Sequence, residues 1–156
     1  MDSAAEGQVT VTQVAYAAFD FATANLMLAD DKLDESSKVA NNSRRDAAAS
    51  VLLSGKGVGV DALSAIDEAE FRRLAVGASL ADDVVDKASS FLYADGDLGL
   101  AARYGGVVDQ LSTELACSQC CGAVLITVGG VLAIPGAPTI AGAALVLGVI
   151  GIAGSC

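Results

Sequence analysis

The sequence divides sharply by charge, and this division limits what the chain can fold into. All nine basic and all 19 acidic side chains lie between Asp2 and Glu114, whereas residues 115–156 carry none. An uncharged segment this rich in apolar residues needs protein or lipid to cover it. We therefore predict two units, an acidic helical domain over residues 1–114 and an uncharged, cysteine-bearing hairpin over residues 115–156.

The acidic segment is predicted to be all-helical. Alanine is abundant in it, runs of β-branched residues are short, and no proline precedes Pro135. Apolar residues recur at helical spacing, and residues that favour helix N-termini precede several of these stretches. About five amphipathic helices follow: Val9 to Asp30, Asp34 or Ser36 to Leu53, a third opening at Asp61 or Ser64, a fourth opening at Ser79–Asp82 and ending at Asp95, and Asp97 to Glu114.

Two glycine-rich stretches are interpreted as breaks in the helical pattern. Gly55 is expected to end the second helix, and the run from Gly55 to Gly59 is expected to be a flexible connection. This run lacks the spacing of a phosphate-binding P-loop, and no strand precedes it. Gly105 and Gly106 are expected to weaken the last helix of the segment.

The composition excludes several classes of function. The chain has no histidine, which rules out histidine-based triads and histidine metal ligands. A formal net charge of −10 with nine basic residues argues against nucleic-acid binding. No residue set has an assignable catalytic role, so we predict no enzyme, no cofactor and no metal site. The charged clusters are expected to lie on helix surfaces or in a first helical turn: Arg44–Arg45, Arg72–Arg73, and Asp82, Asp83 and Asp86.

The acidity itself has two explanations, which the sequence leaves open. A high content of aspartate with few lysines is typical of proteins from a high-salt, halophilic cytoplasm. A large net charge also keeps an apolar chain soluble in ordinary conditions.

A turn rich in proline and glycine divides the uncharged tail. Pro135, Gly136 and Pro138 form this turn, and they separate halves of 21 and 18 residues. Each half is close to the roughly 20 residues that cross a bilayer as a helix. We therefore predict a hydrophobic, Gly/Ala-rich helical hairpin.

Small side chains in the second half of the tail indicate close helix packing. Ala144 and Gly148, and then Gly151 and Ser155, are each four residues apart. This spacing lets helix backbones approach closely in an apolar medium. It also makes self-association through the hairpin an expected property of the chain.

The sequence does not determine whether lipid or protein surrounds the hairpin. The tail contains no tryptophan, tyrosine, lysine or arginine to mark a membrane interface. Three arrangements fit this composition: a permanent membrane anchor, a hairpin wrapped by the amphipathic helices, and a peptide that is released or inserts into membranes.

All four cysteines lie in the tail, at Cys117, Cys120, Cys121 and Cys156. In an antiparallel hairpin the first three lie near the C-terminus, so a disulfide from one of them to Cys156 would close the open end. Zinc binding by the four, a redox pair at Cys117 and Cys120, and inert buried thiols are the alternatives. Connectivity does not follow from sequence, although a vicinal Cys120–Cys121 pair would be strained.

An acidic segment followed by such a tail resembles the precursors of bacteriocins and microhalocins. The residues that carry the resemblance are those from Cys117 to Gly122 and the glycine-rich run to Cys156. The resemblance implies a secreted antimicrobial peptide that acts on the lipid membrane of a target cell. The acidic region would then be a leader, a chaperone for the tail or an immunity element.

The expected function is therefore that of a precursor whose C-terminal tail is the membrane-active peptide. Gly105–Gly106 fits a double-glycine processing site, which would require a processing protease or an exporter. No classical signal peptide is apparent, because no basic residue precedes Lys32. The product would be secreted after processing, or it would be membrane-associated. The alternative is a non-enzymatic structural or membrane-anchored interaction protein, such as a virion or vesicle component.

Overall fold

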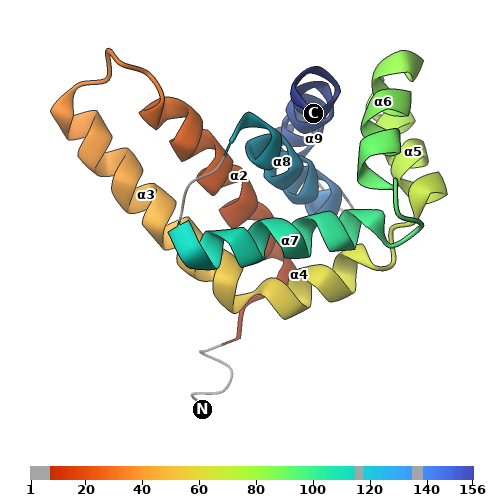
Figure 1. The fold of residues 1–156 in the computed structure, drawn as a ribbon, viewed down its shortest axis with the longest axis horizontal. Helices are drawn as coiled ribbons and strands as arrows, with labels where there is room; N and C mark the ends of the chain where they lie inside the picture. Colours follow the sequence, from red (N-terminus) through yellow and green to blue (C-terminus); the bar gives the residue numbers. More distant parts are fainter. Residues whose placement is uncertain (1–7, 115–117, 135–138) are drawn as a thin grey trace.

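The structure, a computed structural model, describes residues 8–114, 118–134 and 139–156, and these ranges hold α-helices and no strand. The predicted all-α class is thus confirmed over the described ranges (Figure 1). The helices are α2 (Val11–Leu28), α3 (Glu35–Ser54), α4 (Lys56–Leu63), α5 (Glu68–Gly77), α6 (Asp82–Leu92), α7 (Gly99–Glu114), α8 (Gln119–Ala133) and α9 (Thr139–Ser155).

The prediction of a flexible connection at Gly55–Gly59 is wrong, because α4 begins at Lys56. Gly55 ends α3 and immediately precedes α4, so the chain changes direction there without a loop. Gly59 lies inside α4 against α7, where an added Cβ would come within 2.6 Å of the Tyr104 ring. The glycine at 59 therefore allows close helix packing instead of providing flexibility.

The expected start of the third helix at Asp61 or Ser64 is also wrong. Ser64 follows the last residue of α4, and its hydroxyl donates to the Val60 carbonyl. The next helix, α5, begins after Asp67, whose carboxylate accepts a hydrogen bond from the Glu70 amide at 2.9 Å. Asp67 thus caps α5, because an aspartate oxygen satisfies an amide that has no partner within the helix.

Two further expectations about helix ends differ from the structure. Ser79 does not cap α6, since its backbone has a φ of 67° and Ala81 precedes the helix without a side-chain cap. Gly105 and Gly106 do not interrupt α7, which runs through both. Packing of α7 against α4, where Gly105 faces Val60, offsets the low helix propensity of glycine.

Helix α8 lies in the middle of the molecule. It packs most extensively against α9 and α2, while α6 contacts α9 and α4 contacts α7. Figure 1 shows α8 and α9 between α2–α3 on one side and α5–α6 on the other, with α4 and α7 running below them. Side chains from both sides of the charge boundary share one hydrophobic core, which includes Phe21, Tyr104, Leu125 and Ile152.

Candidate functional site

The hairpin of α8 and α9 contains no charged residue, and α8 is the more buried of its two helices. Every residue from Cys121 to Val131 is buried. A helix that is apolar on all sides requires cover on all sides. The one hydroxyl in this run, on Thr127, donates to the Ala123 carbonyl at 2.8 Å, so it is satisfied within the helix.

Two adjacent glycines let α8 fit between its neighbours. A Cβ added at Gly129 would lie 2.7 Å from the carbonyl oxygen of Ala15 in α2. A Cβ added at Gly130 would lie 2.5 Å from the amide nitrogen of Leu145 in α9. One glycine therefore faces each neighbour, and the two backbones approach α8 from different sides.

The small residues expected to mediate helix packing occupy different environments. Ala144 is buried, and Gly148 lies against the backbone and side chain of Thr127. Gly151 faces Ala123, to which an added Cβ would come within 3.0 Å. Ser155 is exposed at the end of α9.

A disulfide closes the open end of the hairpin. It joins Cys120, in the first turn of α8, to Cys156, with a Cα–Cα distance of 5.4 Å. Cys121 is also disulfide-bonded, and Cys117 lies outside the described residues. A vicinal Cys120–Cys121 bond is thereby excluded. The zinc alternative required thiolates from cysteines that the structure instead holds in disulfides.

Two expected sites remain, the turn of the hairpin and the pair of glycines proposed for processing. Pro135, Gly136 and Pro138 lie outside the described residues, between the end of α8 and the start of α9. Gly105 is half-buried and Gly106 is exposed, and both are helical. Among the described residues, no helix meets the combined length and hydropathy expected of a membrane span.

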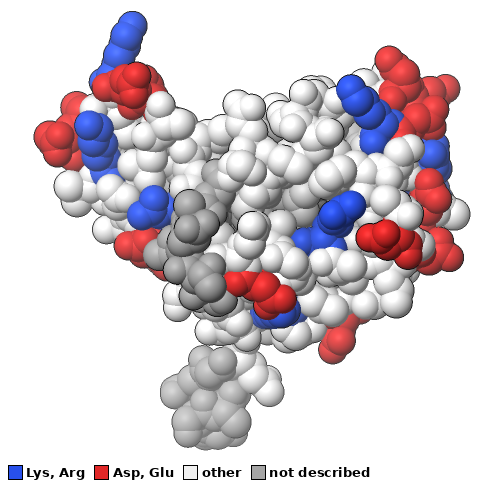
Figure 2. All heavy atoms as spheres, in the orientation of Figure 1, with Lys and Arg blue, Asp and Glu red and all other residues white. Residues whose placement is uncertain are grey.

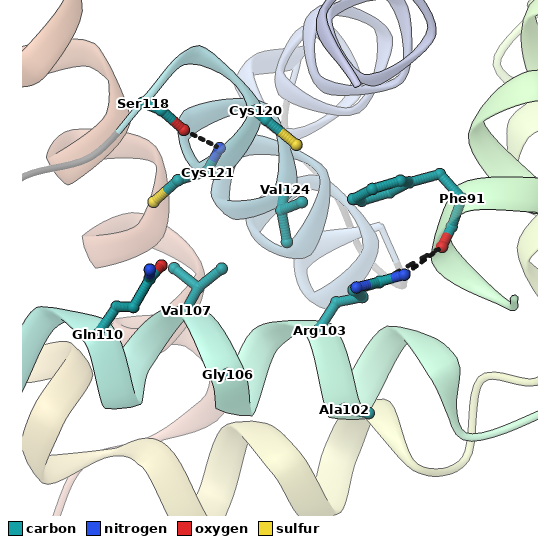
Figure 3. Close-up of a pocket in the computed structure, with 10 residues that line it drawn as sticks. All are labelled: Phe91, Ala102, Arg103, Gly106, Val107, Gln110, Ser118, Cys120, Cys121 and Val124. Carbon is teal, nitrogen blue, oxygen red and sulfur yellow. Dashed lines mark hydrogen bonds between the residues drawn. The ribbon is translucent and has the colours of Figure 1, made fainter. Parts of the chain in front are cut away.

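A cavity of about 350 Å³ opens beside the disulfide, between α7 and the start of α8 (Figure 3). Arg103 lies across it, with its guanidinium carbon 4.4 Å from the centre of the Phe91 ring and Nη2 donating to the Phe91 carbonyl at 3.2 Å. The Ser118 hydroxyl accepts from the Cys121 amide and caps α8. Arg103 and Ser118 thus have structural roles, and no nucleophile–base pair is apparent among the residues that line the cavity.

The charged helices present their charges to solvent in pairs. Arg44 bonds Asp20 at 2.9 Å, and Arg72 bonds both Glu68 and Asp86. Figure 2 shows charged side chains gathered over the α2–α3 end and over α5 and α6, with further charged groups lower on this face and uncharged surface across its upper middle. The pairs are exposed, so each contributes little to stability.

Comparison with known proteins finds no family model, curated protein or solved structure that matches the chain. From the sequence alone, Gly129 and Gly130 are interpreted as residues that weaken a helix and Thr127 has no packing role, whereas in the structure all three determine how closely α8 packs. Their signal was present as small residues in the middle of the first apolar run, but their partners in α2 and α9 could only be identified in three dimensions.

Proposed function

We propose that this chain is the precursor of a secreted, membrane-active antimicrobial peptide carried by residues 115–156. The observation that supports this proposal is the burial of α8, whose residues from Cys121 to Val131 are covered by helices of both segments. In this proposal the acidic segment acts as a cover that keeps the apolar hairpin soluble until it is released.

Burial of apolar side chains stabilises the contact between the acidic segment and the hairpin. Each large apolar side chain of α8 gains roughly 1.5–3 kcal/mol from burial, and this gain is lost if the helix meets water. Helix α2 supplies much of the covering surface, with buried alanines at positions 15, 18 and 22 and with Phe21. Release of the hairpin therefore exposes a surface that either aggregates or enters lipid.

The released hairpin would leave as one unit. The disulfide between Cys120 and Cys156 ties its two ends together. The backbone groups of two helices are largely satisfied internally, which is the condition for stability in hydrocarbon. Helices of 15 and 17 residues are shorter than the roughly 20 that span a bilayer. The proposed action is insertion of the closed hairpin in a way that disrupts the bilayer.

Processing at Gly105–Gly106 belongs to this proposal. A cut after Gly106 would leave the last turns of α7, from Val107 onward, attached to the hairpin. Because both glycines lie within α7, a protease would need local unwinding of this helix. A dedicated protease or exporter that opens α7 would therefore control release.

Vesicle leakage tests the proposal directly. A sequence-specific protease site is placed directly after Glu114, ahead of all four cysteines, and the oxidised chain is compared before and after cleavage. Leakage of dye from lipid vesicles is expected only after cleavage. A variant chain carrying C120S and C156S serves as a control for the role of the closed end. If the cleaved, oxidised product neither binds nor permeabilises vesicles, the proposal is wrong.

A second candidate function is a non-enzymatic interaction protein that acts as the intact chain. It is favoured by the outer side of α9, where Leu147 and Ile150 are exposed without any cleavage. Intact mass spectrometry of the native product from cells and medium separates the two candidates. A shorter C-terminal species in the medium supports the precursor, whereas a full-length, cell-associated chain supports the interaction protein.

A further inference from the structure

The cavity beside the start of α8 contains an arginine to which the described residues supply no acidic partner. Arg103 lies in this cavity of about 350 Å³, between α7, the start of α8 and the end of α6. Every other arginine forms an ion pair with an aspartate or a glutamate: Arg44, Arg45, Arg72 and Arg73. In a chain with 19 acidic side chains, a cation that is left without one inside a cavity indicates a site for an anion from solution.

The guanidinium of Arg103 is held in place by one part and keeps another part available. Its Nε and Nη2 atoms both donate to the Phe91 carbonyl, at 3.4 and 3.2 Å, and its central carbon lies 4.4 Å from the centre of the Phe91 ring. No hydrogen bond from Nη1 is found among the described residues. Because a guanidinium carries five donors in a rigid fork, contact with Phe91 orients the group while Nη1 can still bind a ligand.

The walls around this arginine are mostly apolar. Val107, Val124 and the Phe91 ring line the cavity (Figure 3), and no acidic side chain is among the described residues that do so. Ser118, which caps α8, also lies at the wall, so the positive end of the α8 dipole is directed to the same place. A ligand with one negative group and an apolar body would therefore find a complement for each of its parts.

We propose that this cavity binds a small carboxylic acid with a short aliphatic chain. Its carboxylate would lie on Arg103, because a planar carboxylate matches the fork of a guanidinium, and its chain would lie against Val107 and Val124. A phosphate group would leave polar oxygens unpaired against the apolar walls. The volume is at the low end of the roughly 300–1,000 Å³ of small-molecule sites, so a chain of about six to eight carbons suits it better than a long acyl chain.

Such a ligand would touch both segments of the chain at once. Arg103 and Val107 belong to α7 of the acidic segment, whereas Val124 belongs to α8 of the hairpin. Binding would therefore stabilise the arrangement in which the acidic segment covers α8. The inference concerns the intact chain, and it does not depend on the proposed release of the hairpin.

Isothermal titration calorimetry of the oxidised full chain with octanoate at pH 7 tests the inference. One saturable site per chain is expected, and octanoate should raise the midpoint of thermal unfolding. Acetate, which lacks the chain, and 1-octanol, which lacks the charge, should each bind at least about tenfold more weakly. Arg103→Gln is expected to weaken octanoate binding about tenfold, whereas Arg73→Gln, the same change of charge at a side chain that is 69% exposed on α5, leaves it unchanged.

Gly106→Leu tests the cavity while keeping the arginine. Gly106 lines the cavity, and an added Cβ there meets no heavy atom within 4 Å, so leucine can occupy the space and also favours the helix. Octanoate binding should again fall about tenfold, and circular dichroism verifies that both cavity variants keep their helical content. The inference is overturned by the absence of saturable binding up to about 10 mM octanoate, by unchanged binding in Gly106→Leu, by equal losses in Arg103→Gln and Arg73→Gln, or by inorganic phosphate that binds as tightly as octanoate.

Discussion

At the scale of single residues, the glycines of the hairpin differ in what surrounds them, and this difference is measurable. Gly148→Ala is expected to destabilise the fold by about 1–3 kcal/mol, because its Cβ would meet the backbone of Thr127. Gly142, in the same helix, has no neighbour within 4 Å of an added Cβ. Gly142→Ala is therefore expected to stabilise by roughly 0.5–1 kcal/mol through helix propensity. Denaturant unfolding measures both, and equal effects would contradict the packing described here.

Two buried tyrosines make a second matched pair. The Tyr93 hydroxyl donates to the Ile66 carbonyl at 2.8 Å, whereas the Tyr104 hydroxyl is buried with no hydrogen-bond partner among the described residues. Tyr93→Phe is expected to lower the free energy of unfolding by about 1 kcal/mol. Tyr104→Phe is expected to leave it unchanged or raise it, because it removes an unsatisfied group. Thermal unfolding at neutral pH checks this, and a larger loss for Tyr104→Phe would be the contrary result.

The same residues predict a loss of stability in alkali. Burial raises the pKa of Tyr104 from 10.0 to about 12, and burial together with nearby carboxylates raises the pKa of Tyr93. Above pH 10 the unfolded chain loses these protons first, so the free energy of unfolding falls as pH rises through the interval from about 10 to about 12. Unfolding midpoints across this range measure the fall. Tyr104→Phe should make it shallower, and an unchanged slope would contradict the assignment.

At the scale of helices, the position of the α5 cap is open to test. Asp67→Ala is expected to cost about 1 kcal/mol, because it removes the oxygen that accepts from the Glu70 amide. Ser64→Ala is expected to cost less, since the Ser64 hydroxyl only adds a bond to a carbonyl already within α4. Chemical denaturation of the two variants ranks them. A larger loss of stability for Ser64→Ala than for Asp67→Ala would contradict the assignment of Asp67 as the cap of α5.

Sequence periodicity located most helices of the acidic segment but not all of their ends. The helices expected from Val9 and from Asp34 or Ser36 match α2 and α3 closely, because a long apolar stripe defines the first and Asp34 caps the second. Helix α4 was missed because its glycines indicated a loop. Gly59 instead receives Tyr104, a residue far along the chain, and local sequence holds no information on that contact.

The candidate site, like the helices of the acidic segment, was predictable only in part. The loss of charge after Glu114 identified an apolar hairpin, and the positions of its cysteines indicated where it could be closed. The choice of Cys120 as the partner of Cys156 depends on which side of α8 faces the end of α9. That orientation comes from the packing of Gly129 and Gly130 against two different helices, which a linear pattern does not specify.

At the scale of the whole molecule, the disulfide is expected to contribute substantially to stability. The bond spans a sequence separation of 36 residues, for which the chain-entropy model gives roughly 4 kcal/mol. Replacing both Cys120 and Cys156 with serine is therefore expected to lower the free energy of unfolding by an amount of this order. Urea unfolding with and without the replacement measures it. A change well below 1 kcal/mol would mean that the unfolded chain gains little freedom when the bond is absent.

The covalent link between Cys156 and Cys120 also determines how the molecule responds to mechanical load. A pull on the C-terminus passes through the disulfide and reaches the first turn of α8 without travelling along α9. Helix α9 therefore cannot be peeled away one turn at a time from its end. The load instead reaches α8 and α9 together. Any machine that extracts this hairpin by its C-terminus has to dislodge both helices together.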